Sequence, residues 1–169
     1  MSHGIGYRDK LYRALNPVWA RQPLSGAGAA RFGGRFNAVG MPALYCSLSP
    51  LTALREANQV GDLQPTVLVA YNAKIERVFD GRSLEALAVF GMTPELLADP
   101  AWRDTLAVSG GTSTQTFAKS LIERKFNGLL VPSFARGAGA DDLNLVLWRW
   151  GPKPPSRIEL IDDENRLLR

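Results

Sequence analysis

The residues of this chain that are best suited to chemistry are arginines, a glutamate, a tyrosine and a serine. Arg35 follows two glycines in the stretch RFGGRFN at residues 31–37, so its guanidinium is expected to project from a tight turn. Tyr45 lies in the apolar run that follows, and Glu56 falls inside the next predicted helix. A guanidinium pairs with phosphate through two parallel hydrogen bonds, and a carboxylate stabilises a nearby developing cation. These residue types could therefore bind a phosphate group and hold a carboxylate beside a cation.

Other common chemistries find little support in the sequence. The single histidine, His3, lies in a predicted tail, which argues against a metal site and a Ser-His-Asp triad. The single cysteine, Cys46, is expected to be a small buried hydrophobe. The segment GAGAAR at residues 26–31 has arginine where a dinucleotide fingerprint needs its third glycine, and no strand plainly precedes it. The segment GGT at residues 110–112 lacks the Gly-Lys-Ser/Thr that completes a phosphate-binding loop.

A strand and a helix are predicted to position the central stretch. Residues 41–47 form an apolar run that begins near a proline and predicts a strand. Ser49 followed by Pro50 predicts the N-cap and first position of a helix. We expect a buried stripe of Leu51, Leu54 and Ala57, and this pattern places Glu56 about two turns into the helix.

The remaining elements mix strands and helices without a regular βαβ alternation. Further strands are expected at residues 10–15, 65–72, 129–133, 143–150 and 157–161, with 75–79 continuing or pairing with the second of these. Helices are expected at 83–87, from 93 onward, and through 117–125 with Ser113 or Thr114 as cap. Residues 1–8 are expected to be loose and 25–30 to form a mobile loop. The pattern favours an irregular α+β or mixed α/β fold over a doubly wound sheet.

Length and composition indicate one soluble domain spanning residues 1–169, with a core of about 10–150. The apolar share is 46% and the charged share 21%, as in an ordinary globule. The net charge of +4 suits phosphates or acidic partners but is too small to argue for direct nucleic-acid binding. No signal-peptide pattern and no apolar stretch of the ~20 residues needed to cross a membrane is found, so a cytoplasmic location is expected.

The central stretch also resembles a known family. The pattern GGRFN-x-x-G-x-P-A-L-Y-x-S-x-S-x-x-T-A-L-x-E at residues 33–56 is similar to the core of the RES domain. The segments LYRA at 11–14, FNGLLVPS at 126–133 and NLVL at 144–147 resemble further strands of that family. The resemblance implies a toxin encoded beside a Xre-type antitoxin. It also implies a fold similar to that of ADP-ribosyltransferases, with a central split β-sheet flanked by helices, and a reaction that consumes NAD.

NAD as substrate gives the candidate residues specific roles. Breaking the nicotinamide–ribose bond passes through an oxocarbenium-like transition state, as in glycoside cleavage. Arg35 is the leading candidate to bind the pyrophosphate and Glu56 to oppose the developing cation, although either could be an ordinary surface residue. Tyr45 could contact nicotinamide and take part in catalysis, or could be a core aromatic.

Three further residues are candidates for binding NAD. Arg13 lies in the middle of a strand, where an unpaired charge would be costly unless the strand lines a cleft. Arg31 is a weaker candidate that could simply line a loop. Ser133, at a strand end, could donate a hydrogen bond to substrate or only begin a turn. Asn144, Asp141 and Asp142 rank below these, and Trp102, Trp148 and Trp150 are expected in the core or at an interface.

Several functional alternatives stay open at the level of sequence. ADP-ribose could pass to a protein side chain, to water or to phosphate. The chain could instead be a non-catalytic nucleotide- or RNA-binding module regulated by a partner protein, or a purely structural partner of an antitoxin. No metal and no membrane is expected to take part.

Overall fold

The structure is a computed structural model that describes residues 4–59 and 61–167. The strands are β1 (Ile5–Leu15), β2 (Leu44–Ser47), β3 (Val67–Asp80), β4 (Gly128–Pro132), β5 (Leu143–Leu147) and β6 (Ser156–Leu160). The helices are the 3-10 turn η1 (Pro17–Trp19), α1 (Ala27–Phe32), α2 (Pro50–Ala57), α3 (Leu84–Ala88), α4 (Pro94–Leu97), α5 (Trp102–Ser109) and α6 (Ser113–Glu123). The expected α+β class is confirmed, and none of the described helices is long and apolar enough to cross a membrane.

The sheet consists of two three-stranded halves that are joined at both corners. Its strand order is β1-β2-β5-β4-β3-β6, and β1 also pairs with β3 along most of its length. One corner is the short parallel pairing of β3 residues 78–80 with β4 residues 128–130. The other is the antiparallel contact of Tyr12 with Ser47. The predicted split sheet is therefore present as the halves β6-β3-β1 and β2-β5-β4, linked by two short pairings.

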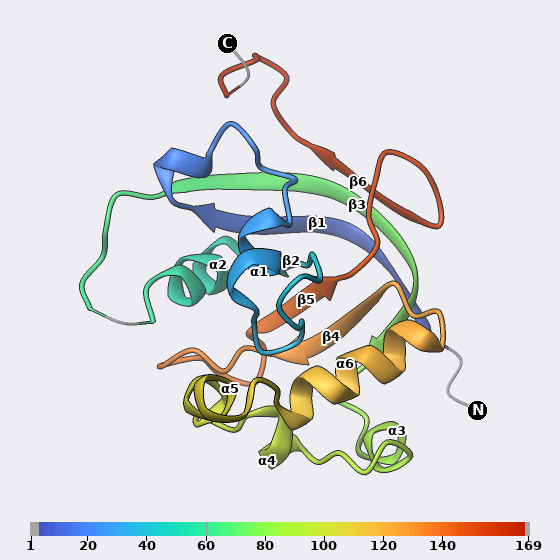
Figure 1. The fold of residues 1–169 in the computed structure, drawn as a ribbon. Helices are drawn as coiled ribbons and strands as arrows, with labels where there is room; N and C mark the ends of the chain where they lie inside the picture. Colours follow the sequence, from blue (N-terminus) through green and yellow to red (C-terminus); the bar gives the residue numbers. More distant parts are fainter. Residues whose placement is uncertain (1–3, 60, 168–169) are drawn as a thin grey trace.

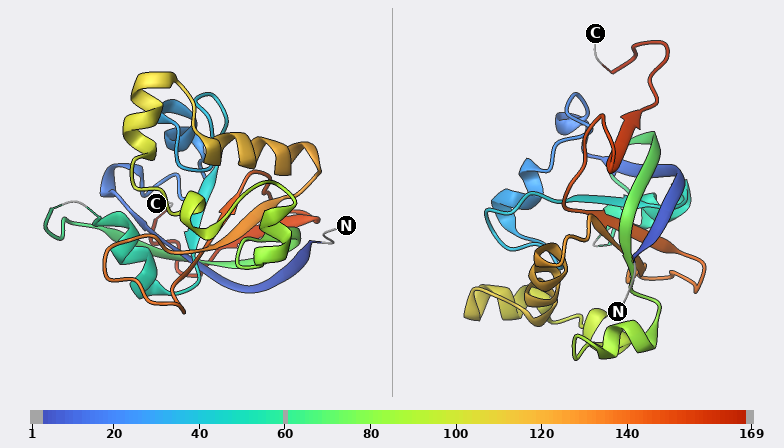
Figure 2. Two further views of the ribbon diagram at one scale, coloured as in Figure 1. Left: turned by 90° about the horizontal axis from the view of Figure 1, so that it is seen from below. Right: turned by 90° about the vertical axis from the view of Figure 1, so that its right-hand side faces the viewer.

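The half β2-β5-β4 is the middle of three layers (Figures 1 and 2). Successive side chains of a strand point to opposite faces. Leu145 and Leu147 therefore pack into the core between the two sheet halves, whereas Val146 packs into a second core beneath the helices. This second core contains edge-to-face contacts of Phe79 with three other phenylalanines, on α6 and nearby segments. The alternation presents one face of the middle layer to the helices, and this is the face on which polar residues gather at the strand ends.

Several predicted boundaries differ from the structure. Residues 5–8 are not loose but belong to β1, because they pair with the far end of β3. The strand expected at residues 65–72 begins at Val67 and continues through the expected segment 75–79 to Asp80, so the two form the single strand β3. The cap of α6 is Thr112 rather than Ser113 or Thr114. Residues 1–3, part of the segment expected to be loose, lie outside the described residues.

The predicted mobile loop at residues 25–30 is wrong, because α1 occupies residues 27–32. Alanines favour helix, and they outweigh the glycines of this segment. Gly33, with φ of 73°, ends the helix and donates its N–H to the carbonyl of Ala29. The small-residue segment is thus an ordered element that leads into the glycine turn.

The predicted orientation of α2 is also wrong, although its start is confirmed by the bond from the Thr52 amide to the Ser49 hydroxyl. Leu51 is 55% exposed, and the buried residues are Thr52 and Ala53. The reason is that Thr52 donates to Asp142, the residue just before β5, and this bond fixes the rotation of the helix. This rotation turns Glu56 toward the ends of β4 and β5.

Candidate active-site cleft

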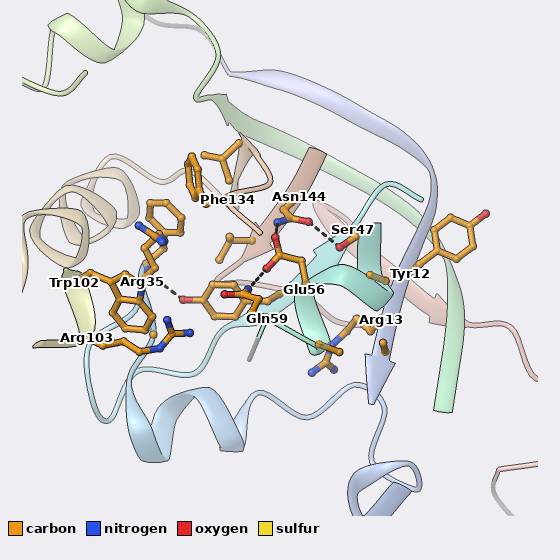
Figure 3. Close-up of a pocket in the computed structure, with 18 residues that line it drawn as sticks. Tyr12, Arg13, Arg35, Ser47, Glu56, Gln59, Trp102, Arg103, Phe134 and Asn144 are labelled. Atoms are coloured by element: carbon orange, nitrogen blue, oxygen red, sulfur yellow. Dashed lines mark hydrogen bonds between the residues drawn. The ribbon is translucent and has the colours of Figure 1, made fainter. Parts of the chain in front are cut away.

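A cleft of about 330 Å³ opens on the helix-covered face of the middle layer (Figure 3). Its floor is made by alternate residues of the three strands, namely Tyr45, Ser47, Val131, Asn144 and Val146. Its walls come from α2, the turn at residues 34–36, the first residues of α5, Phe134 and the end of β1. Segments far apart in the sequence therefore meet at one site of a size typical for small ligands.

Glu56 is fixed in the middle of this cleft. Its Oε1 accepts hydrogen bonds from the Ser133 hydroxyl at 2.5 Å and from the Asn144 amide at 2.6 Å. Its Oε2 accepts one from the Gln59 amide at 2.6 Å. The Ser47 hydroxyl donates to Asn144 Oδ1 at 2.7 Å, which sets the amide so that its NH₂ group faces Glu56. The carboxylate is thus held in one orientation before any ligand binds.

Ser133 contributes to the site through Glu56. It is 8% exposed and does not line the cleft, and its hydroxyl also accepts from the Ala135 amide. From the sequence, Ser133 was expected either to contact substrate directly or only to begin a turn. The structure places it behind Glu56, where its visible role is to orient the carboxylate.

The glycine turn that carries Arg35 is held by side chains around it. A Cβ on Gly34 would lie 2.5 Å from both Asn37 Oδ1 and the Tyr45 hydroxyl, so this position accepts only glycine. Gln115 donates to the carbonyls of Gly34 and Asn37, and Trp148 donates to that of Phe36. These contacts set the direction in which Arg35 leaves the turn.

Tyr45 is part of this support. Its hydroxyl accepts from the Phe36 amide at 3.0 Å and donates to Asn37 Oδ1 at 2.7 Å. Burial raises the pKa of the Tyr45 hydroxyl, although the Phe36 amide and Arg35 oppose this rise. The ring of Tyr45 lines the cleft, but its proton is already committed to Asn37. The Tyr45 hydroxyl therefore supports the glycine turn, whereas the sequence suggested that Tyr45 takes part in catalysis.

Arg35 lies at one end of the cleft and contacts the α4–α5 segment. Its Nη1 donates to the carbonyls of Leu97 at 3.0 Å and Asp99 at 2.8 Å. Its guanidinium lies 4.8 Å from the Phe134 ring centroid and 5.6 Å from that of Trp102.

A second guanidinium lies close by. Arg103 lies 4.6 Å from the Trp102 ring centroid. Burial lowers the pKa of Arg35, and the nearby Arg103 lowers it further, while Glu56 opposes the shift. Two cations and two aromatic rings therefore share this end of the cleft.

The other two candidate arginines differ in position. Arg13 lines the opposite end of the cleft in Figure 3, and its Nη1 donates to the Pro23 carbonyl at 2.9 Å. Arg31 is exposed on α1, with its guanidinium 5.2 Å from the Phe32 ring centroid. It is not among the residues that line the cleft, so the structure brings Arg13 to the site but not Arg31.

Sequence reasoning missed several residues that line the cleft. They are Ser47, Gln59, Trp102, Arg103 and Phe134, and Asn144 was ranked too low. Two of them had a local signal: Asn144 is a polar residue inside an apolar strand, and Ser47 ends an apolar run within the family pattern. Cys46 is buried as expected, and burial raises the pKa of its thiol to about 12, so it is no nucleophile at neutral pH.

Comparison with known proteins agrees with the motif. The family model of the RES domain matches residues 10–168. A search among curated proteins gave no match.

Proposed function

Because this chain belongs to the RES domain family, we propose that it is an enzyme that cleaves NAD at the nicotinamide–ribose bond. The observation that carries this proposal is the Glu56 carboxylate. It is held by Ser133, Asn144 and Gln59 in a cleft whose one end carries two guanidiniums. A fixed anion beside a cationic end suits a substrate that joins a cationic nicotinamide ribose to a diphosphate.

The proposed reaction needs no general acid to protonate the leaving group. The C1′–N bond breaks with its electron pair moving to the nicotinamide nitrogen, so the leaving group departs neutral and needs no proton. Positive charge then spreads over C1′ and the ring oxygen of the ribose. Glu56 would oppose that charge, and because its hydrogen bonds are already made, little reorganisation is needed as the charge develops. An acceptor attacks C1′ and afterwards releases its proton to solvent.

The proposal also concerns the acceptor of ADP-ribose and the antitoxin partner. ADP-ribose could pass to a protein side chain, making the protein a mono-ADP-ribosyltransferase, or to water or phosphate. As a toxin, the protein would be expressed with a Xre-type antitoxin that restrains it. Mass analysis of the products formed from NAD, with phosphate and with cell extract in separate reactions, distinguishes the three acceptors.

The sharpest test of the reaction is Glu56→Gln. This change keeps the size of the side chain but removes its charge, which matters most while the bond is breaking. We expect kcat for nicotinamide release to fall about a hundredfold or more, with little change in NAD affinity. Glu123→Gln, at an exposed site on α6 away from the cleft, is the matched control and should leave kcat unchanged.

Two results would contradict the proposal. A folded Glu56→Gln protein with normal kcat would remove Glu56 from the mechanism. Tight NAD binding by the wild-type protein without any nicotinamide release, in all acceptor conditions, would favour a nucleotide-binding module instead.

A further inference from the structure

Arg35 and Arg103, at one end of the cleft, differ in the hydrogen bonds that they make to the protein. Both hydrogen bonds of Arg35 to described residues go from Nη1 to backbone carbonyls of Leu97 and Asp99. Arg35 therefore attaches the α4–α5 segment to the glycine turn. Arg35 keeps the N–H groups of Nε and Nη2 for a ligand, whereas the Arg103 guanidinium, which makes no hydrogen bond to the described residues, keeps all five of its donors.

The segment that Arg35 contacts leads directly into α5. Asp99 Oδ1 accepts from the Ala101 amide, and α5 starts at the next residue, Trp102. The Trp102 ring contacts both guanidiniums, at 5.6 Å from Arg35 and 4.6 Å from Arg103. Arg35 thus places Trp102 and Arg103 at the cleft by holding the segment that precedes them.

The position of Arg103 has an electrostatic cost that no carboxylate offsets directly. Among residues 4–59 and 61–167 the salt bridges are formed by other arginines, and none involves Arg103 or Arg35. The two cations are close enough for Arg103 to lower the pKa of Arg35. The carboxylates of Glu56 and Asp99 oppose this shift, but in the described part of the chain neither forms a salt bridge with the two cations. Like charges kept close together without a salt bridge form a favourable site for an anion, and a polyvalent anion relieves the repulsion most.

The rest of the cleft limits where such an anion can bind. Glu56 occupies the middle and would repel a phosphate, so an anionic group must lie toward one end. Figure 3 shows Arg35, Trp102 and Arg103 at one end and Arg13 at the other. Two guanidiniums match the two charges of a diphosphate better than one does, and Arg13 already donates to Pro23.

We propose that Arg103, at the start of α5, is the principal ligand of the substrate's diphosphate, and that Arg35 chiefly positions it. The inference rests on the proposed function for the identity of the ligand, a dinucleotide diphosphate. It reassigns the role expected of Arg35 from direct phosphate contact to support. The exposed Arg103 fork can form paired bonds to phosphate while its plane stays against Trp102.

Calorimetric titration with ADP-ribose tests this without any turnover, because ADP-ribose has no nicotinamide bond to break. Arg103→Gln in the full-length protein should weaken ADP-ribose binding at least about tenfold, and Arg103→Lys should recover only part of it. Adenosine, which has neither a phosphate nor a nicotinamide bond, should bind Arg103→Gln and wild type equally. Arg124→Gln is the matched control, since Arg124 also stacks on an aromatic ring, 4.5 Å from that of Phe90, but lies outside the cleft.

The outcomes separate this inference from the proposed reaction. Unchanged ADP-ribose affinity in Arg103→Gln, or a loss confined to Arg13→Gln, would overturn the assignment even if NAD is cleaved. Loss of ADP-ribose binding in Arg103→Gln would support it even if wild type releases no nicotinamide. A melting temperature of Arg103→Gln equal to that of wild type shows that the loss is not due to misfolding.

Discussion

At the scale of single residues, the cleft contains side chains that can contact a ligand, and other side chains that keep the first group in position. Glu56 and Arg103 face the cleft, whereas Ser133 and Asn144 orient Glu56, and Tyr45 holds the glycine turn. A motif read from sequence cannot distinguish these roles, because Glu56 and Tyr45 lie in the same short pattern and the other residues lie outside it. The distinction has consequences that mutants can measure.

Tyr45→Phe tests the structural role of the hydroxyl. Removing it leaves the Phe36 amide and Asn37 Oδ1 without their partner, which should destabilise the fold by about 1–3 kcal/mol. For a chain of this length each kcal/mol lowers the melting temperature by about 2–4 °C. Nicotinamide release well below the melting temperature should stay within a few fold of wild type. A loss of kcat as large as that of Glu56→Gln, with an unchanged melting temperature, would instead place the hydroxyl in the chemistry.

At the scale of elements, the rotation of α2 determines whether the carboxylate reaches the cleft. Asp142 accepts from Thr52 at 2.6 Å and from Arg55 at 3.0 Å, so two residues of α2 are attached to the segment before β5. The Gly139 amide donates to the same carboxylate. Leu51 is exposed as a consequence, and Glu56 is turned inward. Asp142 is thus remote from the chemistry but connected to it through the helix.

This attachment should depend on pH. The hydrogen bonds from Thr52 and the Gly139 amide, with the charge of Arg55, hold the pKa of the Asp142 carboxyl below its usual value. The stabilisation is therefore complete above the unfolded pKa of about 3.9 and is lost as pH falls through the lower folded pKa. We expect Asp142→Asn to lower the melting temperature at pH 7, with the difference from wild type vanishing in strongly acidic solution.

Asp141→Asn is the control for this series, because Asp141 is an exposed neighbour on the same turn. It should follow the wild-type stability curve from pH 7 down to acid. A difference between Asp142→Asn and wild type that is constant across the whole range would show that the carboxyl's charge is not what attaches α2.

The elements that sequence predicted well are those with local signals. Ser49 caps α2 as expected, since its hydroxyl accepts from the Thr52 amide, and the helices expected near residues 83 and 93 are present as α3 and α4. The rotation of α2 was not predictable, because it follows from Asp142, far along the chain. The composition of the cleft was unpredictable for a similar reason. Arg35 and Glu56 lie in one motif, whereas Trp102 and Arg103 are far along the chain and follow the segment at residues 97–99 that Arg35 contacts.

At the scale of the whole molecule, the two sheet halves and the helices leave the cleft at the junction of several segments. The turn at 34–36, α2 and the start of α5 each contribute one wall, while the strands of the middle layer form the floor. Such a site can be closed by covering one rim. The rim next to the glycine turn carries α1, where Phe32 is 68% exposed, and the following loop, where Val39 is 64% exposed.

This rim is where we expect an antitoxin to bind if the protein is restrained by one. Apolar side chains exposed beside a charged site are typical of a surface that a partner covers. The complex should then release nicotinamide far more slowly than the free protein. Amide hydrogen exchange should be slowed across residues 27–40.

Phe32→Ser should weaken the complex and restore turnover without changing the NAD affinity of the free protein, since Phe32 does not line the cleft. Leu84→Ser, at a similarly exposed site on α3, should leave inhibition intact. Full turnover in a stoichiometric complex would show that the partner binds elsewhere, because a covered rim and an open cleft are incompatible.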